Sequence, residues 1–234
     1  LIPNPCFMSY VPLLELFNAF PVLTKLDENF LPNIDDMKKK ITKKTRVILI
    51  NSPSNPTGAV YPKKILEEIA DVAVEHDLLV FSDEAYEKII YEGKHVSMGS
   101  LNGLKNHVAT FQTFSKSFAM CGYRLGYVIA PPKLAQELKK VHIYSTISAP
   151  TLSQIVGVKA LQEKTYVKNM VKEYNRRRKM IVKRLNQMGL ETKMPQGAFY
   201  TFSKIPSKDS KKFALDLLKK KKVAVVPGVE FGQD

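Results

Sequence analysis

Stretches of consecutive apolar residues alternate along this chain with stretches whose apolar residues recur every three or four positions. Largely apolar runs occupy 46–51, 78–82, 108–113 and 124–130. Runs of this kind are typical of strands that are buried on both faces of a parallel sheet. Between the first two runs, residues 62–76 have the spacing of an amphipathic helix. The alternation predicts an α/β fold, with a mostly parallel sheet flanked by helices.

The rest of the pattern predicts more helices and three short strands. We expect helices at 13–20, 34–42, 151–162, 167–187 and 210–221, and short strands at 21–25, 197–202 and 223–226. Near residue 150 the strand–helix alternation gives way to the long basic helix expected at 167–187. We therefore predict a large domain at 1–150, followed at 151–234 by a linking helix and part of a smaller α+β domain.

Polar segments follow three of the predicted strands. Asn55 lies in NSPSNPTG, Asp83 in SDEAY and Lys116 in TFSKSFAMCGYRLG. Their spacings of 28 (83 − 55) and 33 (116 − 83) residues correspond to about one helix plus one strand. Because ligands of parallel sheets bind at the carboxyl ends of the strands, we expect these residues to meet in one crevice.

Lys116 differs from the other lysines because its neighbours are apolar or small. Phe114, Phe118 and Met120 predict partial burial of this side chain, and burial favours the neutral amine that can attack a carbonyl. Arg124 follows eight positions later (124 − 116), and a guanidinium can donate two parallel hydrogen bonds to a phosphate. From this segment alone, a lysine at a strand end and a solvated arginine explain the pattern equally well.

The formal net charge of +14 raises the question of nucleic acid. Most of the lysines fall on predicted helices beside acidic residues, and no basic–aromatic pattern of a nucleic-acid motif is visible. We interpret the charge as a lysine-rich solvated surface, and we expect no nucleic-acid partner. No apolar run approaches the length of a membrane span, so we expect no membrane association.

The chain has two cysteines, Cys6 and Cys121, and four scattered histidines. This number of cysteines does not form a disulfide framework, and the histidines lack ligand spacing. We therefore expect a reducing, cytoplasmic setting and no metal site. Cys121 is expected to be a small core residue.

Five segments together resemble one known family. They are NPTG at 55–58, SDEAY at 82–86, SKSFAMCGYRLGY at 115–127, GAFY at 197–200 and VVPGVEFG at 225–232. In this order and spacing they resemble the pyridoxal-phosphate-dependent aminotransferases of fold type I, class I/II, and are similar to bacterial and archaeal aspartate and aromatic aminotransferases. The resemblance covers nearly the whole chain.

The resemblance implies catalytic roles for three residues. Lys116 would form a Schiff base with the cofactor aldehyde and then move a proton between the substrate Cα and the cofactor. Asp83 would accept a hydrogen bond from the pyridine nitrogen, which keeps the ring protonated so that it can act as an electron sink. Tyr86 would donate to the phenolate oxygen of the ring. Without the resemblance, Asp83 could equally be a helix N-cap.

The resemblance also implies further contacts to the cofactor. Asn55 would share the phenolate oxygen with Tyr86, and an unusual geometry of the Asn55–Pro56 bond is suggested. Arg124 would hold the phosphate together with the hydroxyl groups of Thr113 and Ser115. Phe7 would stack on the ring, although it could also be an ordinary core residue.

Two other aromatic residues near these motifs, Tyr10 and Tyr200, are interpreted as packing residues.

The resemblance implies transamination between an L-amino acid and a 2-oxo acid in a homodimer. A carbon–sulfur lyase or another pyridoxal-phosphate enzyme of this fold, or a non-catalytic regulator that senses the cofactor, is an alternative.

Two parts of the family pattern lie outside the chain at its two ends: a phosphate-binding loop and an arginine that binds the substrate carboxylate. We therefore expect the chain to be truncated at both ends, and residues 1–234 alone to be catalytically impaired.

Overall fold

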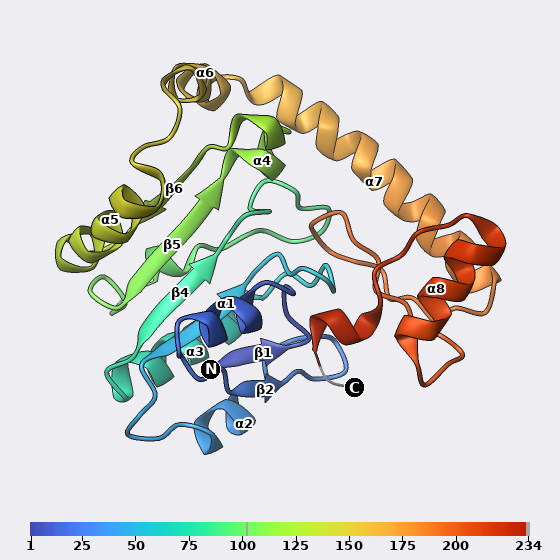
Figure 1. Cartoon of the computed structure of the whole chain (residues 1–234), viewed down its shortest axis with the longest axis horizontal. Coiled ribbons are helices and arrows are strands. Elements are labelled where there is room, and N and C mark those ends of the chain that lie inside the picture. The colour runs from blue at the N-terminus through green and yellow to red at the C-terminus, as the bar shows by residue number, and fades with distance from the viewer. Residues whose placement is uncertain (102, 233–234) are drawn as a thin grey trace.

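The computed structural model describes residues 1–101 and 103–232, in which six strands form two sheets. The strands are β1 (Ile2–Asn4), β2 (Leu23–Lys25), β3 (Val47–Asn51), β4 (Leu79–Asp83), β5 (Val108–Thr113) and β6 (Gly126–Ile129). β1 and β2 form a parallel pair. The larger sheet has the order β3-β4-β5-β6, in which β3, β4 and β5 are parallel and β6 is antiparallel to β5 (Figure 1). The α/β fold with a mostly parallel sheet is thus confirmed.

The register of the larger sheet brings the ends of its parallel strands together. Asn51, the last residue of β3, lies opposite Asp83, the last residue of β4. Asp83 in turn lies opposite Phe111 on β5. The chain segments that leave β3, β4 and β5 therefore start from the same edge of the sheet.

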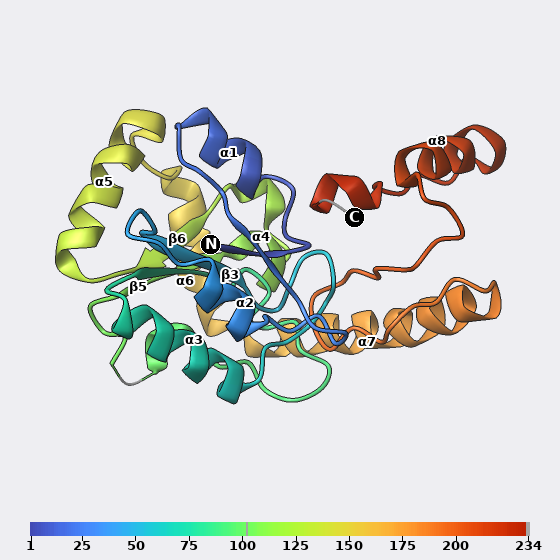
Figure 2. The same cartoon turned by 90° about the horizontal axis from the view of Figure 1, so that it is seen from below.

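Helices lie on both faces of this sheet (Figure 2), although they cover the two faces to different extents. The α-helices are α1 (Tyr10–Leu16), α2 (Ile34–Lys39), α3 (Lys63–Glu75), α4 (Phe114–Ser117), α5 (Pro132–Thr146), α6 (Thr151–Gln162), α7 (Lys164–Gln187) and α8 (Ser210–Lys221). Figure 2 shows α3 on one face, and α1 and α5 on the opposite face. Short 3-10 helices occur at Met98–Ser100, Cys121–Tyr123 and Gly228–Phe231. No helix in the described part of the chain is long and apolar enough to cross a membrane.

The main core lies between the sheet and α3. Leu66 and Ile69 of α3 pack in one buried cluster with Ile48 and Val80 of the strands. Burial of each such side chain contributes about 1.5–3 kcal/mol. The prediction that these strands are buried on both faces is wrong, because only one face is fully covered. Along β3 and β4 the burial alternates between buried and half-buried residues, as it does in a sheet with one partly open face.

Two predicted strands are absent from the described residues. The segment 197–202 makes only an isolated bridge from Gly197 to Ile90, because the neighbouring Ala198 has a left-handed backbone with φ 54°. The segment 223–226 has no strand beside it and remains without regular structure. Conversely, α5 was not predicted, although Leu134, Leu138 and Val141 have helical spacing. The helix expected at 13–20 begins earlier, at Tyr10.

The long helix α7 leads away from the sheet, and the chain then turns back toward it. Figure 1 shows α7 running from α6 to the region of α8. The segment after α7 returns to the end of the sheet, where the Gln196 and Gly197 amides donate to the Gly58 carbonyl. Farther along, the Cys6 amide donates to the Phe231 carbonyl. Residues from both ends of the chain therefore contribute to the same region.

Candidate functional site

The structure places the three predicted polar segments at one edge of the sheet. Asn55 lies in the loop after β3, Asp83 ends β4, and Lys116 lies in α4, directly after β5. Since the three strands are parallel, their carboxyl ends open in the same direction. The peptide bond between Asn55 and Pro56 is cis, which agrees with the unusual geometry expected there.

The carboxylate of Asp83 is held by two donors. The Tyr10 hydroxyl donates to Asp83 Oδ2, and the Ala85 amide donates to Asp83 Oδ1 at 3.0 Å. Burial raises the pKa of Asp83 above its usual value, and the hydrogen bond from Tyr10 acts in the opposite direction. The interpretation of Tyr10 as a packing residue was therefore incomplete. The sequence feature that could have indicated this contact is the position of Tyr10, three residues after Phe7 and at the start of a helix.

Phe7 lies beside Tyr10 and is half-buried. The two rings meet edge to face, with centroids 5.5 Å apart and an interplanar angle of 81°. Phe7 is thereby connected through Tyr10 to Asp83.

Lys116 is half-buried, as its apolar neighbours predict. Phe114, Met120 and Leu125 form a small core cluster around this segment. Thr113 caps α4, and its side chain accepts a hydrogen bond from the Ser115 amide at 3.1 Å. Lys116 Nζ lies 5.8 Å from the centroid of the Phe199 ring, so its ammonium group faces an aromatic surface.

Tyr86 is 4% exposed, and burial raises its pKa well above the ordinary value. The Asn55 side chain and the Tyr200 hydroxyl both form hydrogen bonds with the Tyr86 hydroxyl. The buried Asn55 Oδ1 atom has no partner, so the Asn55 amide group supplies the N–H in its bond with Tyr86. Tyr200, interpreted from the sequence as a packing residue, therefore also bonds a predicted site residue.

Arg124 lies on the exposed side of the Lys116 segment. Its backbone is left-handed, with φ 50° and ψ 46°, and its Nη1 donates to the Cys121 carbonyl at 3.0 Å. The thiol of Cys121 in turn donates to the Ser115 carbonyl at 3.1 Å. Cys121 is exposed, so the prediction that it is a core residue is wrong.

A cavity of about 470 Å³ opens beside Asp83, over the partly open face of the sheet. Its lining residues are Tyr10, Leu49, Phe81, Asp83, Ala85, Phe111, Gln112, Thr113 and Leu138. Among the predicted site residues, Asp83 and Thr113 belong to this lining, whereas Lys116 and Tyr86 do not. The cavity therefore adjoins the site on the side of the Asp83 carboxylate.

A second acidic group follows Asp83 in the chain. Within the described residues, Glu84, Glu87 and His95 are the group whose ligand atoms lie close enough to hold a metal ion. Glu84 is already surrounded by protein donors, including Ser82 Oγ at 2.9 Å, Ser97 Oγ at 2.9 Å and the Met98 amide at 3.1 Å. Its carboxylate thus secures the end of β4 to the segment at 95–98.

Comparison of the sequence with known protein families identifies the class of protein that has this fold and site. The profile of the family described as "Aminotransferase class I and II" matches residues 1–233, and the chain belongs to this family. Members of the family use pyridoxal 5′-phosphate.

Individual relatives agree with this assignment. The chain is 48% identical to an aspartate aminotransferase of Pyrococcus abyssi, over 100% of this chain and 62% of the relative. It is 45% identical to aromatic-amino-acid aminotransferase 2 of Thermococcus litoralis, again over 100% of this chain and 62% of the relative. The chain thus spans about 62% of the length of these curated relatives.

Solved structures give the same result. The aromatic aminotransferase from Pyrococcus horikoshii has a TM-score of 0.95 and 48% identity, covering 99% of this chain and 64% of that one. The aspartate aminotransferase of Thermus thermophilus with maleate has a TM-score of 0.92 and 35% identity, covering 98% of this chain and 62% of that one.

The residues at this site fit pyridoxal phosphate. The buried Asn55 side chain lies beside Tyr86, and its amide N–H groups suit a phenolate oxygen. The buried Asp83 carboxylate suits a pyridinium nitrogen, and the half-buried Lys116 amine suits an aldehyde. These three groups approach the same edge of the sheet from three different strands.

Proposed function

We propose that the protein is a pyridoxal-phosphate-dependent aminotransferase, which transfers an amino group from an L-amino acid to a 2-oxo acid. The observation that carries this proposal is that Lys116, Asp83 and Tyr86 lie at or just after the ends of the neighbouring parallel strands β4 and β5, in a chain that belongs to the aminotransferase family. Two of its relatives are named as aminotransferases of aspartate and of aromatic amino acids, so these two classes of amino donor are the first to test.

Lys116 is the proposed catalytic base. When bound, pyridoxal phosphate supplies an electron sink for the pair left at the substrate Cα after its proton is removed. The Lys116 amine would hold the aldehyde group of the bound cofactor. As a base, the same amine would accept the proton from the substrate Cα.

Asp83 is the proposed partner of the pyridine nitrogen. Its function needs an ionised carboxylate, yet burial acts against ionisation. The hydrogen bonds from Tyr10 and the Ala85 amide stabilise the charged form. Tyr10 therefore supports the electron sink through Asp83.

Asn55 and Tyr86 are proposed to bind the phenolate oxygen of the ring, and Phe7 to pack against the ring face. Arg124 is the proposed phosphate ligand, assisted by the Thr113 and Ser115 hydroxyl groups. The exposed guanidinium of Arg124 keeps donors available, since the described contact uses only its Nη1.

We also propose that the protein acts as a homodimer in the cytoplasm, with a cofactor domain at 1–150 and a second unit at 151–234. Exposed apolar side chains on α6, among them Leu152 and Ile155, support association with a second copy. Two cysteines without a disulfide support a reducing compartment. Sedimentation of the product of the complete gene tests the dimer, because a mass of one subunit at micromolar concentration contradicts it.

The experiment that tests the activity compares wild type, Lys116→Ala and Lys105→Ala, each expressed from the complete gene. With pyridoxal phosphate, wild type and Lys105→Ala are expected to develop a visible absorption band, and borohydride should fix the cofactor onto Lys116 in a peptide map. Lys105 is exposed and serves as the matched control. The absence of a band in folded wild type contradicts the proposal.

A screen of amino donors completes the assignment. Aspartate, phenylalanine and tyrosine are each offered with 2-oxoglutarate, and the new amino acid is measured. Lys116→Ala is expected to lose at least 10³-fold in rate, because it lacks both the covalent link and the base. Cysteine is offered in parallel, because release of sulfide from cysteine, or of carbon dioxide from any donor, without formation of glutamate supports the lyase or decarboxylase alternatives.

A further inference from the structure

The hydroxyl group of Tyr86 is approached from two sides within the protein. The Asn55 amide donates to it, and the Tyr200 hydroxyl lies in hydrogen-bond contact with it. The rings of Tyr86 and Tyr200 meet edge to face, with centroids 5.5 Å apart and planes at 81°. The contact between the hydroxyl groups is therefore part of an ordered aromatic pair.

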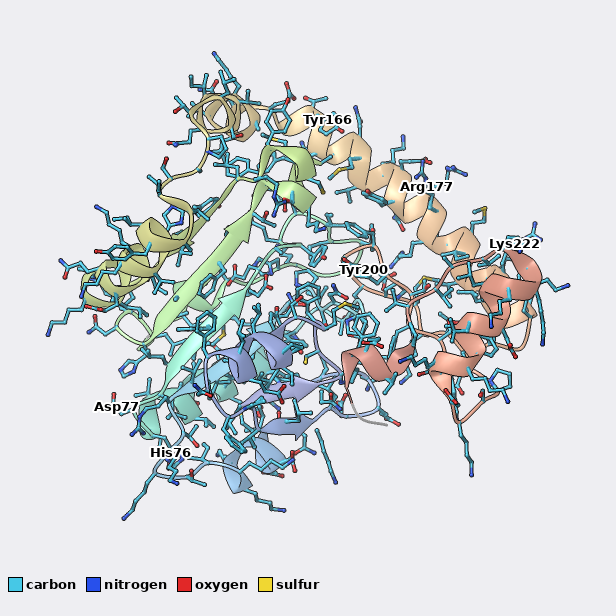
Figure 3. All side chains as sticks on the ribbon, viewed as in Figure 1. His76, Asp77, Tyr166, Arg177, Tyr200 and Lys222 are labelled. Carbon is cyan, nitrogen blue, oxygen red and sulfur yellow. The ribbon has the colours of Figure 1, made fainter. Side chains whose placement is uncertain are left out.

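The backbone delivers Tyr200 to this position. The Gln196 and Gly197 amides donate to the Gly58 carbonyl at 2.9 Å each, and the Ala198 amide donates to the Ile89 carbonyl at 2.9 Å. These bonds tie the segment before Tyr200 both to the loop after β3 and to the segment after Tyr86. Figure 3 shows Tyr200 on the chain between α7 and the end of the sheet. Its location is thus determined by main-chain contacts on both sides.

Either hydroxyl can donate in this contact, and a count of protons and lone pairs gives the consequence of each direction. A tyrosine hydroxyl offers one proton and two acceptor positions. At Tyr86 the Asn55 amide uses one acceptor position. If Tyr86 donated its proton to Tyr200, it would have none left for a ligand. If Tyr200 donates instead, the second acceptor position is filled and the Tyr86 proton is free.

We propose that Tyr200 is a positioning residue whose hydroxyl donates to the Tyr86 oxygen and so directs the Tyr86 proton toward the cofactor. This inference rests on the proposed function, because it assigns that proton to the phenolate oxygen of pyridoxal phosphate. A hydroxyl that accepts hydrogen bonds becomes a stronger donor, since chains of hydrogen bonds polarise one another. Tyr200 therefore acts through Tyr86 and does not itself touch the reacting atoms.

The test is a pH titration of the visible absorption of the cofactor-loaded protein, expressed from the complete gene. A donor to the phenolate oxygen weakens the hold of that oxygen on the proton shared with the lysine nitrogen, so the donor lowers the midpoint of the titration. Tyr200→Phe weakens the donor and is expected to raise the midpoint by about half a pH unit. Tyr86→Phe removes the donor and should raise the midpoint further.

A double variant separates action through Tyr86 from a direct effect. In the Tyr86→Phe background, Tyr200→Phe should cause no additional shift, because the group through which it acts is gone. Additive shifts in the double variant overturn the proposal.

Tyr174→Phe is the matched control in the same aromatic cluster. Tyr174 stacks on Phe199 with centroids 5.4 Å apart, and its hydroxyl makes no hydrogen bond within the described residues. Its variant should keep the wild-type midpoint. An unchanged midpoint in Tyr200→Phe, or an equal shift in Tyr174→Phe, contradicts the positioning role. If the wild-type protein forms no visible absorption band with pyridoxal phosphate, the result contradicts the proposed function itself.

Discussion

The carboxyl group of Asp83 is needed for the proposed function, but its burial lowers the free energy of unfolding. Burial raises its pKa above the ordinary value of 3.8, despite the opposing hydrogen bond from Tyr10. For an acid with a raised pKa, the stabilising contribution is complete below the unfolded value and is lost as the pH rises through the folded value. Above the unfolded-state pKa, burial of this carboxyl group therefore lowers the free energy of unfolding of the cofactor-free protein.

Asp83→Asn is accordingly expected to stabilise the cofactor-free protein near pH 7 while weakening cofactor binding. An increase of about 2–4 °C in Tm corresponds to roughly 1 kcal/mol for a chain of this size. The gain should shrink toward about pH 3, where the wild-type carboxyl is protonated.

Scanning calorimetry measures the difference for Asp83→Asn against Asp77→Asn. The control residue, labelled in Figure 3, has a side chain that is 97% exposed, so its variant should leave Tm unchanged. A lower Tm for Asp83→Asn at neutral pH argues against a destabilising carboxylate.

Single residues also show where the sequence was sufficient and where it was not. Lys116, Asp83 and Asn55 were predictable, because each follows a recognisable apolar strand. The hydroxyl contacts of Tyr10 and Tyr200 were not, since they join residues 73 and 114 positions apart. A packing aromatic and a hydrogen-bonding tyrosine have the same signature in a hydropathy pattern.

At the scale of elements, the segment 195–200 acts as a connector between the loop after β3 and the chain after Tyr86. The sequence predicted a strand here, because GAFYTF alternates in polarity. The left-handed backbone at Ala198 and the close packing of Gly197 produce a bend instead. Strand propensity was overridden by contacts with distant residues.

Gly197→Ala tests how closely this connector is packed. An added Cβ would lie 2.8 Å from Val60 Cγ2, 2.9 Å from Pro53 Cβ and 3.0 Å from the Ile89 carbonyl oxygen. We expect a loss of about 1–3 kcal/mol in the free energy of unfolding, as is typical of overpacking. Urea unfolding measures this loss.

Gly122→Ala is the control for this experiment, because no atom lies within 4 Å of the position of its Cβ. If Gly197→Ala loses no more free energy of unfolding than Gly122→Ala, the connector has room for a methyl group and the prediction is wrong.

For the whole molecule, the net charge of +14 needs an explanation. Part of the positive charge is paired locally, as in the contacts of Arg176 and Arg177 with Glu173 at 2.8 Å. The lysine-rich helices α2 and α8 lie in different regions of the molecule (Figure 1). The basic side chains of these two helices therefore do not belong to one stripe.

Binding to a labelled DNA duplex tests this interpretation. We expect weak binding at low salt that disappears by about 0.15 M salt, where the Debye length is about 8 Å. Fluorescence anisotropy over a salt series measures the loss. Binding that persists at this salt concentration, with a preference for particular sequences, favours the regulator alternative.

The sequence by itself determined the local features of this protein. The order of most strands and helices, and the polar residues at the strand ends, follow from apolar periodicity and chain connectivity, which depend on near neighbours. Only the tertiary structure decided that β6 is antiparallel, that one face of the sheet stays partly open, and that Tyr10 and Tyr200 bond Asp83 and Tyr86. These features arise from contacts between distant segments, and no local pattern encodes which segments will meet.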